Sequence, residues 1–376
     1  MTALSLVRTV SSSPLLLRDP EVARPPRALP GDWPPRTVDV TVIIPAYNEA
    51  ATIAETVDSI QRQTVRPRHV IVVDDCSSDD TGARARAMGV TVLRPDANTG
   101  SKAGAQNAAL ARVDTEFTLA VDADTVLEED AIERLLAAVD SPNVASACGF
   151  VVPRRIRSTW ERGRYVEYLF GFGFYKRTQD FYRRPLISSG CFSLYRTRDL
   201  LSAGGWQTRT LTEDVDLTWT FYEAGRDVRF VSDAVCYPIE PSSYRLMCTQ
   251  LRRWAHGFVQ NVRLHWRGTR STPMLRLMVA IWFLEAATAS IAYLFVVPVL
   301  ALVFREPAML LLYVLDAPLI LVPVIAEAWP RGEVHKALAS FPAFWVTRLL
   351  GSVFTLRALW GELVRNRSFH VYEKGH

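Results

Sequence analysis

The sequence is poor in cysteine, in net charge and, before residue 270, in long apolar runs. Its five cysteines form no C-x-x-C pair, which argues against a disulfide framework and indicates reduced thiols facing a cytosol. The net charge is only +4, and the arginines are scattered or close to apolar segments. That distribution favours anionic lipid headgroups over nucleic acid as the partner. The apolar run at Leu15–Leu17 is too short for a signal-peptide core, so we expect the following domain to stay in the cytosol.

Composition divides the chain into five parts. Residues 1–37 are rich in proline and arginine and are expected to be disordered. We expect a globular domain at 38–240, an amphipathic interface helix at 241–275, a membrane region at 276–364 and a basic tail at 365–376.

Apolar strands alternate with amphipathic helices in the first part of the globular domain. We expect strands at 40–45, 69–74, 90–93 and 116–121, and helices at 51–63, 81–88, 101–112 and 128–139. The strands are nearly continuous apolar runs, as is typical of parallel strands that are covered on both faces. The pattern predicts an α/β fold with a doubly wound, mainly parallel sheet. Right-handed crossovers then place the carboxyl ends of these strands along one edge.

Polar side chains follow each of the four strands at that edge. The main ones are Glu49, Asp75, Lys102, Asp122 and Asp124. Ligands of open α/β sheets bind at this edge, and two carboxylates one residue apart suit Mg²⁺ or Mn²⁺ that is shared with substrate phosphates. Each group alone also fits a helix cap or a solvated charge, but their convergence indicates a nucleotide site.

Four segments of this region resemble the consecutive motifs of family-2 inverting glycosyltransferases of the GT-A fold. They are Ile43–Glu49 (IIPAYNE), Val73–Asp79 (VDDCSSD), Asn98–Lys102 (NTGSK) and Asp122–Asp124 (DAD). The resemblance extends over about residues 38–266 and implies that 38–240 is a Rossmann-like GT-A catalytic domain. It also implies a nucleotide-diphosphate sugar donor, usually a UDP sugar.

The resemblance assigns a role to each residue of these motifs. Ala46, Glu49 and Asp75 would flank the nucleoside, and Lys102 would lie near the diphosphate. Asp122 would touch the ribose or the metal, and Asp124 would bind the metal.

Thr212-Glu213-Asp214 is a fifth motif, and it precedes a predicted helix at 216–223. Its side chains could serve only as helix caps. In the resembling family, however, the last residue of Thr-Glu-Asp is the base, here Asp214, with Glu213 beside it in the catalytic motif. An inverting transfer needs one base to take the proton of the acceptor hydroxyl, and no covalent intermediate.

The sixth motif lies in a predicted helix at 242–266. Gln250, Arg253 and Trp254 are spaced i, i+3 and i+4, so they share one helix face. They match the Gln-x-x-Arg-Trp motif of the processive, membrane-bound members of the family. By that resemblance Gln250 and Arg253 belong to the donor site, Arg253 neutralises the leaving diphosphate, and Trp254 stacks on the acceptor sugar.

Three apolar segments follow the motifs. Segments 277–304 and 308–326 have the length to span a bilayer, whereas 337–364 contains internal charges and could span or lie at the interface. The flanking basic residues place the catalytic domain in the cytosol of a multi-pass cell-membrane protein. We also expect Glu285, Asp316 and Arg348 to form a polar cluster between the segments.

Aromatic residues and arginines gather in another segment, Trp160–Arg184. Such a composition suits the membrane–water interface, and a packed helix under the sheet is the alternative.

The motifs together imply a membrane-bound inverting glycosyltransferase that moves a sugar from a UDP-sugar donor to a growing β-linked polysaccharide or oligosaccharide. In this respect the chain resembles the synthases of poly-N-acetylglucosamine, hyaluronan and cellulose. Transfer of one or a few sugars to a lipid acceptor is the non-processive alternative, and a non-catalytic membrane scaffold is the alternative of another class. Two or three helices cannot enclose a polymer channel, so secretion of a polymer would require a homo-oligomer or a secretion partner.

Overall fold

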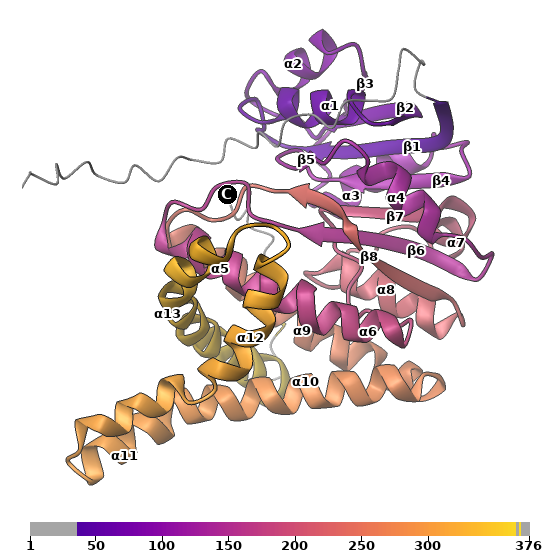
Figure 1. Cartoon of the computed structure of the whole chain (residues 1–376). Coiled ribbons are helices and arrows are strands. Elements are labelled where there is room, and N and C mark those ends of the chain that lie inside the picture. The colour runs from indigo at the N-terminus through magenta and orange to yellow at the C-terminus, as the bar shows by residue number, and fades with distance from the viewer. Residues whose placement is uncertain (1–35, 366–367, 370–376) are drawn as a thin grey trace, which may run out of the picture. The chain divides into compact units, whose positions relative to one another are not determined.

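The computed structural model describes residues 36–365, 368 and 369 (Figure 1). The predictions for residues 1–35, and for most of the basic tail, lie outside the described residues.

A mixed sheet of eight strands forms the centre of the described part of the chain, in the order β3-β2-β1-β4-β7-β6-β8-β5. The strands are β1 (Arg36–Ala46), β2 (Val65–Asp74), β3 (Thr91–Leu93), β4 (Phe117–Val121), β5 (Val126–Leu127), β6 (Val144–Val151), β7 (Phe192–Arg196) and β8 (Asp227–Tyr237). β3, β2, β1 and β4 are parallel to one another, as predicted. β7 runs antiparallel to both β4 and β6, and β5 is antiparallel to β8. The predicted α/β class is confirmed.

Helices cover both faces of the parallel half. They are α1 (Ile53–Gln61), α2 (Thr81–Ala87), α3 (Lys102–Leu110) and α4 (Ala131–Ala138), so the four predicted helices are present. Val42 and Ile44 of β1 pack into one buried cluster with α1 and α4, whereas Ile43 packs into another with α3. This two-sided burial explains why β1 is apolar at successive positions.

The second half of the sheet carries a longer series of helices. They are α5 (Thr159–Phe170), the π-helix η1 (Gly171–Lys176), α6 (Arg177–Phe181), α7 (Thr197–Ser202), α8 (Glu213–Glu223) and α9 (Tyr244–His265). In α5, Tyr165 and Leu169 are buried in one cluster with Phe150 of β6. The packed-helix alternative is therefore what α5 adopts, while Phe181 of α6 is 82% exposed.

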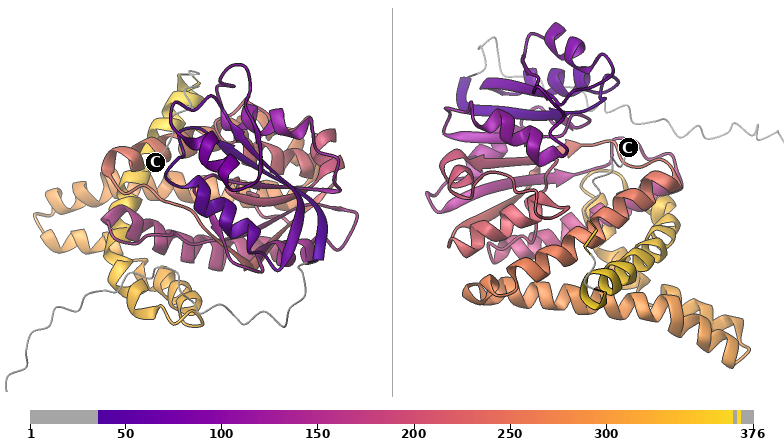
Figure 2. Two further views of the ribbon diagram at one scale, coloured as in Figure 1. Left: turned by 90° about the horizontal axis from the view of Figure 1, so that it is seen from above. Right: turned by 180° about the vertical axis from the view of Figure 1, so that it is seen from behind.

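Helices, most of them apolar, form the last part of the described chain (Figure 2). They are η2 (Gly268–Ser271), α10 (Pro273–Ile291), η3 (Ala292–Val296), α11 (Val297–Val303), η4 (Pro307–Val314), α12 (Ala317–Ala328), α13 (Val334–Leu359) and η5 (Trp360–Val364). Three continuous helical stretches, 273–303, 307–328 and 334–364, are long and apolar enough to cross a membrane. The two predicted spans and the third segment correspond to these stretches.

Candidate active site

The carboxyl ends of β1 and β2 lie side by side and carry the first predicted site residues. Ala46 at the end of β1 is in register with Asp74, and its carbonyl accepts a hydrogen bond from the Asp75 amide at 2.9 Å. The two carboxylate oxygens of Asp75 accept from the amide and the hydroxyl of Thr99, at 2.8 and 2.9 Å. Asp75 thus fastens the loop between β3 and α3 to the end of β2, and the predicted convergence at this edge is present.

Glu49 is the other predicted nucleoside residue on this side. Its side chain is buried, and its Oε2 accepts a hydrogen bond from Thr52 Oγ1 at 2.9 Å. Its backbone amide donates to Thr81 Oγ1 at 2.7 Å, which ties the end of β1 to the start of α2. Glu49 therefore lies at the same strand edge as Ala46 and Asp75.

Lys102 joins motifs that are far apart in the sequence. It is the first residue of α3, after the N-cap Ser101. Its Nζ lies 2.5 Å from Asp122 Oδ1 and 3.6 Å from Glu213 Oε1, and it donates to the Gly190 carbonyl at 3.1 Å. One ammonium group therefore neutralises carboxylates from both the Asp-x-Asp and the Thr-Glu-Asp motifs.

Asp214 faces the same point from α8. Its Oδ2 accepts the Gly190 amide at 3.0 Å, and its Oδ1 accepts the Val215 amide at 2.9 Å. A Cβ atom on Gly190 would lie 3.1 Å from Lys102 Nζ and 3.3 Å from Asp214 Oδ2. The backbone at Gly190 is thus in close contact with both groups, which is why a residue without a side chain stands there.

Glu213 lies between charges of both signs. Burial raises the pKa of its carboxyl, Asp214 raises it further, and Lys102 and Arg253 oppose the rise. Arg253 of the Gln-x-x-Arg-Trp motif is therefore among the charged groups around the Thr-Glu-Asp motif. The site therefore joins three of the predicted motifs around Lys102 and Glu213.

Asp122 and Asp124 are the residues that could hold a divalent metal. Asp124 is 4% exposed and accepts a hydrogen bond from Thr125 Oγ1 at 3.1 Å. Asp122 Oδ1 is shielded from solvent and is approached by Lys102 Nζ. Among the described residues no group of three or more His, Cys, Asp or Glu side chains gathers in the manner of a complete metal site. The donor set, two hard oxygen ligands at a strand end, fits a Mg²⁺ or Mn²⁺ ion that takes its other ligands from phosphates and water.

A buried arginine of α5 contacts two residues of the Gln-x-x-Arg-Trp motif. The guanidinium of Arg164 on α5 is fully buried, and its Nη2 donates to Gln250 Oε1 at 2.6 Å. The Trp254 ring lies against it, with 4.5 Å from the Arg164 Cζ to the ring centroid. Glu167, 2.7 Å from Arg164 Nη1, and the buried Glu240, 3.4 Å from Arg164 Nε, supply the counter-charges. Gln250 and Trp254 are therefore fixed by a residue outside every motif.

Glu240 also lies close enough to Asp124, a candidate metal ligand, for the two charges to interact. Burial raises the pKa of its carboxyl to about 7, Arg164 and Tyr168 oppose the rise, and Asp124 adds to it. Neither Arg164 nor Glu240 is predicted from the sequence. Arg164 lies in the aromatic and arginine-rich segment 160–184, but nothing in the local pattern distinguishes a buried arginine from an interfacial one.

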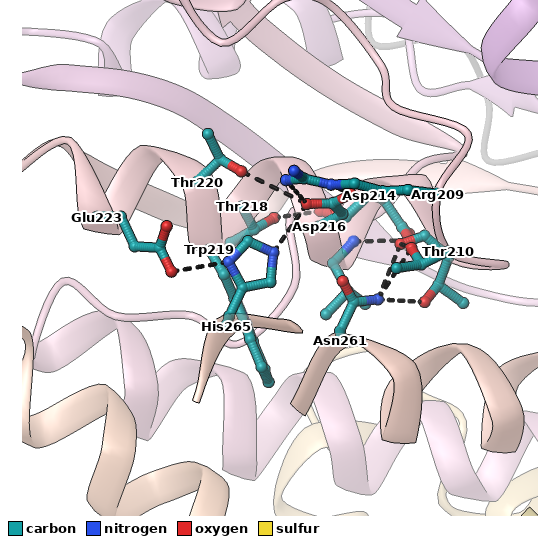
Figure 3. Close-up of polar contacts among 12 residues, drawn as sticks. Arg209, Thr210, Asp214, Asp216, Thr218, Trp219, Thr220, Glu223, Asn261 and His265 are labelled. Atoms are coloured by element: carbon teal, nitrogen blue, oxygen red, sulfur yellow. Dashed lines mark hydrogen bonds and ion pairs between the residues drawn. The ribbon is translucent and has the colours of Figure 1, made fainter. Parts of the chain in front are cut away.

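α9 packs closely against the Thr-Glu-Asp motif. A Cβ atom on Gly257 would come within 2.6 Å of the Thr212 side chain, and Asn261 Nδ2 donates to Thr212 Oγ1 at 2.9 Å. About one turn further along α9, His265 contacts Asp216 of α8 (Figure 3). The helix that carries Gln250, Arg253 and Trp254 is thereby held at a fixed position relative to Asp214.

Comparison with known proteins gives a family match and distant relatives. Residues 41–201 match the model of "Glycosyl transferase family 2". The chain is similar to the poly-beta-1,6-N-acetyl-D-glucosamine synthase of Staphylococcus aureus (strain COL), with 24% identity over 222 residues, which cover 58% of this chain and 54% of that protein. For the protein of the same name in Staphylococcus epidermidis the identity is 24% over 263 residues, which cover 69% of this chain and 63% of that protein. The chain thus spans about half to two thirds of the length of these relatives.

One solved structure is similar over most of both chains. It is the mannosyltransferase PcManGT from Pyrobaculum calidifontis, in complex with GDP-Man and Mn²⁺, with a TM-score of 0.57, 20% sequence identity, and coverage of 90% of this chain and 92% of that chain. At this identity the likeness establishes the fold, and its coverage includes helices beyond the sheet.

Proposed function

From the match of residues 41–201 to the glycosyl transferase family 2 model, we propose that the chain is a membrane-bound inverting glycosyltransferase that uses a UDP-sugar donor. The observation that carries the proposal is the position of Lys102, which is 2.5 Å from Asp122 and 3.6 Å from Glu213. It brings the residues proposed for the donor diphosphate to those proposed for the acceptor. A non-catalytic scaffold would have no need for this arrangement.

The proposed reaction is a single displacement at the anomeric carbon. The acceptor hydroxyl oxygen forms the new bond to that carbon while the bond to the donor diphosphate breaks, and Asp214 accepts the hydroxyl proton. Lys102 and Arg253 stabilise the negative charge on the departing diphosphate. A divalent metal held by Asp122 and Asp124 would supply further charge neutralisation there.

Three other groups of residues complete the proposed site. Ala46, Glu49 and Asp75 would border the nucleoside at the ends of β1 and β2, where Asp75 also fixes the loop before α3. Glu213 would help to hold the ammonium group of Lys102 in place and charged. Trp254 would offer its ring to the acceptor sugar, the opposite face being supported by Arg164.

For the product we propose a β-linked polysaccharide or oligosaccharide, which is supported by the name of the Staphylococcus relatives. Transfer of a single sugar to a lipid acceptor is the second candidate. It is favoured by the small number of apolar helices among the described residues, which cannot enclose a channel. We place the site on the cytosolic side of the cell membrane, facing its donor.

Release of nucleoside diphosphate by the chain in lipid nanodiscs, with UDP-N-acetylglucosamine, UDP-glucose and GDP-mannose as donors, tests the activity. We expect release with a UDP sugar that requires Mg²⁺ or Mn²⁺ and is lost in Asp124→Ala and Asp214→Asn. Release that survives both substitutions refutes the site, and release with GDP-mannose alone refutes the donor. A donor that binds without turnover favours the scaffold. Labelled product that grows by one sugar excludes the polymer.

A further inference from the structure

α13 has the length of a membrane span, yet both of its ends contact the sheet domain. At the start, the N-cap Glu333 accepts a hydrogen bond from Tyr165 of α5 at 2.8 Å. Nearby, the Arg331 guanidinium lies over the ring of Phe150 in β6, 4.3 Å from its centroid. Ala337, one turn into the helix, is completely buried in the cluster that contains Phe150. The first end of α13 is therefore fixed to the sheet itself.

The other end of the same helix is fixed to α9. Glu362 of η5 is completely buried, and its carboxylate is within 3.0 Å of His256 Nδ1 and 2.9 Å of Gln260 Nε2. Gln260 in turn accepts a hydrogen bond of 3.1 Å from the backbone amide of Leu211, the residue directly before the Thr-Glu-Asp motif. Phe369 is held to α9 as well, because its carbonyl accepts a hydrogen bond from Gln260 at 2.8 Å.

These contacts decide on which side the two ends lie. Residues 333 and 362 are about 43 Å apart along a helix that rises 1.5 Å per residue, which exceeds the hydrocarbon thickness of about 30 Å. A helix that crossed the bilayer would have its ends on opposite sides of it. Both ends of α13 contact one folded domain, so the helix lies alongside that domain.

α10 is attached to the domain along its length as well. Leu275 and Val279 are buried in one cluster with Trp219 of α8. Six residues beyond Val279, Glu285 accepts a hydrogen bond from Tyr175 of η1 at 3.0 Å. A helix that ran along the membrane normal would touch the domain at one end only. α10 therefore also runs beside the domain, as Figure 1 shows.

The outer face of the same helix is apolar and exposed. Leu277, Ile281, Leu284, Ile291, Phe295 and Leu302 are between 47% and 78% exposed. Their spacing follows the helical repeat, so they form one row along α10, η3 and α11. Exposed tryptophans accompany it, among them Trp266 and Trp282, and Arg276 lies over the Trp266 ring at 4.4 Å. Tryptophan and arginine beside an apolar row are typical of the membrane–water interface.

The length of the hairpin that leaves the domain agrees with this placement. Near the start of the hairpin, the Tyr293 hydroxyl donates a hydrogen bond to Asp316, which pairs with Arg348 of α13. The tip of the hairpin carries the exposed pair Arg305 and Glu306. These points are twelve residues apart, or about 18 Å. A hairpin along the membrane normal would leave two charged groups within a core of about 30 Å, at a high energetic cost.

We propose that α10, α11 and α13 lie in the plane of one leaflet, with the row from Leu277 to Leu302 against lipid, and that none of them crosses the bilayer. The chain would then be a monotopic membrane protein, with both ends of α13 and the hairpin tip at Arg305 and Glu306 on the same side of the membrane as the sheet domain. This replaces the membrane crossings that length and hydropathy predict. The proposal rests on contacts alone and is independent of any glycosyl transfer.

Labelling with a membrane-impermeant maleimide, read residue by residue by mass spectrometry, tests the sidedness. Asp114→Cys on the sheet domain is the reference, Glu306→Cys reports on the hairpin tip, and Arg365→Cys reports on the end of α13. We expect all three to stay unlabelled in intact spheroplasts and to be labelled at least tenfold more after permeabilisation. Labelling of Glu306→Cys or Arg365→Cys in intact spheroplasts overturns the proposal. Glu306→Cys that reacts only in detergent also overturns it, because the tip would then lie in the hydrocarbon.

Spin labels at Leu277, Leu284 and Ile291 test the in-plane orientation of α10 in nanodiscs. These positions share one helix face, and each step of seven residues is about 10 Å long. We expect one common immersion depth at all three sites. A depth that changes by about 10 Å at each step, as for a helix along the membrane normal, would refute the orientation even if the sidedness result held.

Discussion

The Nε2 atom of His265 lies 2.8 Å from the Oδ1 atom of Asp216, so the end of α9 is joined to the first turns of α8. Both side chains are buried. The other ring nitrogen of His265 is 2.8 Å from Glu223 Oε1, and Arg209 makes two hydrogen bonds of 2.7 Å to Asp216. This cluster, shown in Figure 3, holds the helix of Asp214 against the helix of Gln250, Arg253 and Trp254.

The first prediction is a dependence of stability on pH that comes from this cluster. Burial opposes protonation of His265, but the hydrogen bonds to Asp216 and Glu223 outweigh it, so the pKa of His265 is raised in the folded protein. Because the folded state binds the proton more tightly, this contribution is fully present below the unfolded pKa of about 6.5. It is lost as the pH rises through the raised folded value.

Thermal unfolding of the detergent-purified protein between pH 6 and pH 9 measures the effect. We expect His265→Asn to lower stability by about 1–3 kcal/mol at pH 6, through loss of a hydrogen bond to a charged group, and to flatten the pH profile. His69→Asn is the control, because the His69 side chain is 46% exposed and 3.5 Å from Asp114. A wild-type profile that matches that of His265→Asn would show that the ring is not protonated.

The second prediction concerns the close contact at Gly190. A Cβ atom there would force Lys102 Nζ and Asp214 Oδ2 to move by a few tenths of an ångström. We expect Gly190→Ala to fold normally and to lower the rate of diphosphate release about 10- to 100-fold, because misplaced reacting groups lose that much. Gly171→Ala is the matched control, since nothing lies within 4 Å of its added Cβ. Equal rates in both variants would mean that Lys102 and Asp214 need not keep their observed positions.

The third prediction treats Arg164 as a positioning residue. Arg164→Met removes the hydrogen bond to Gln250 and the support of Trp254, and it leaves Glu240 buried without its counter-charge. Breaking such a pair costs about 3–5 kcal/mol of stability, and adding Glu240→Gln should recover part of it. Arg162→Met, two residues away and half-buried, is the control.

Kinetics separate positioning from folding in the stabilised double variant. If Arg164 orients Trp254 toward the acceptor, the KM for acceptor rises while the KM for donor stays near the wild-type value. Equal changes in both constants, or no change, would leave Arg164 with a structural role only.

The sequence predicted the elements with local signals and missed those that depend on distant partners. The strand ends at Ala46, Asp75 and Asp122 were predictable because apolar runs stop there and polar residues follow. The reversal of β7 was not, since a short buried strand has the same pattern in either direction. The contact between Lys102 and Glu213 joins residues more than a hundred positions apart. In the same way, an apolar helix of spanning length has the same sequence pattern whether it crosses the bilayer or contacts one domain at both ends. The second case is that of α13.

The last prediction concerns the polar cluster expected between the apolar segments. Asp316 Oδ2 is 2.7 Å from Arg348 Nη1 and accepts from Tyr293 at 3.1 Å. Glu285 is bonded separately to Tyr175, whose pKa is raised to about 12 by burial and by this carboxylate. The structure thus gives an ion pair that also accepts a hydrogen bond from Tyr293, and a separate hydrogen bond between Tyr175 and Glu285.

These two contacts should respond differently to neutralisation. Asp316→Asn leaves the guanidinium of Arg348 without its counter-charge, and we expect a loss of about 2–4 kcal/mol and a lower yield of folded protein. Glu285→Gln keeps an acceptor for the Tyr175 hydroxyl, so its effect should stay below about 1 kcal/mol. Glu306→Gln, at the exposed hairpin tip, is the control for removal of a carboxylate, and yield with thermal unfolding in nanodiscs is the measurement. If Asp316→Asn behaves like Glu306→Gln, the ion pair does not hold α13 to the hairpin, and packing around Trp345 and Tyr293 must do so instead.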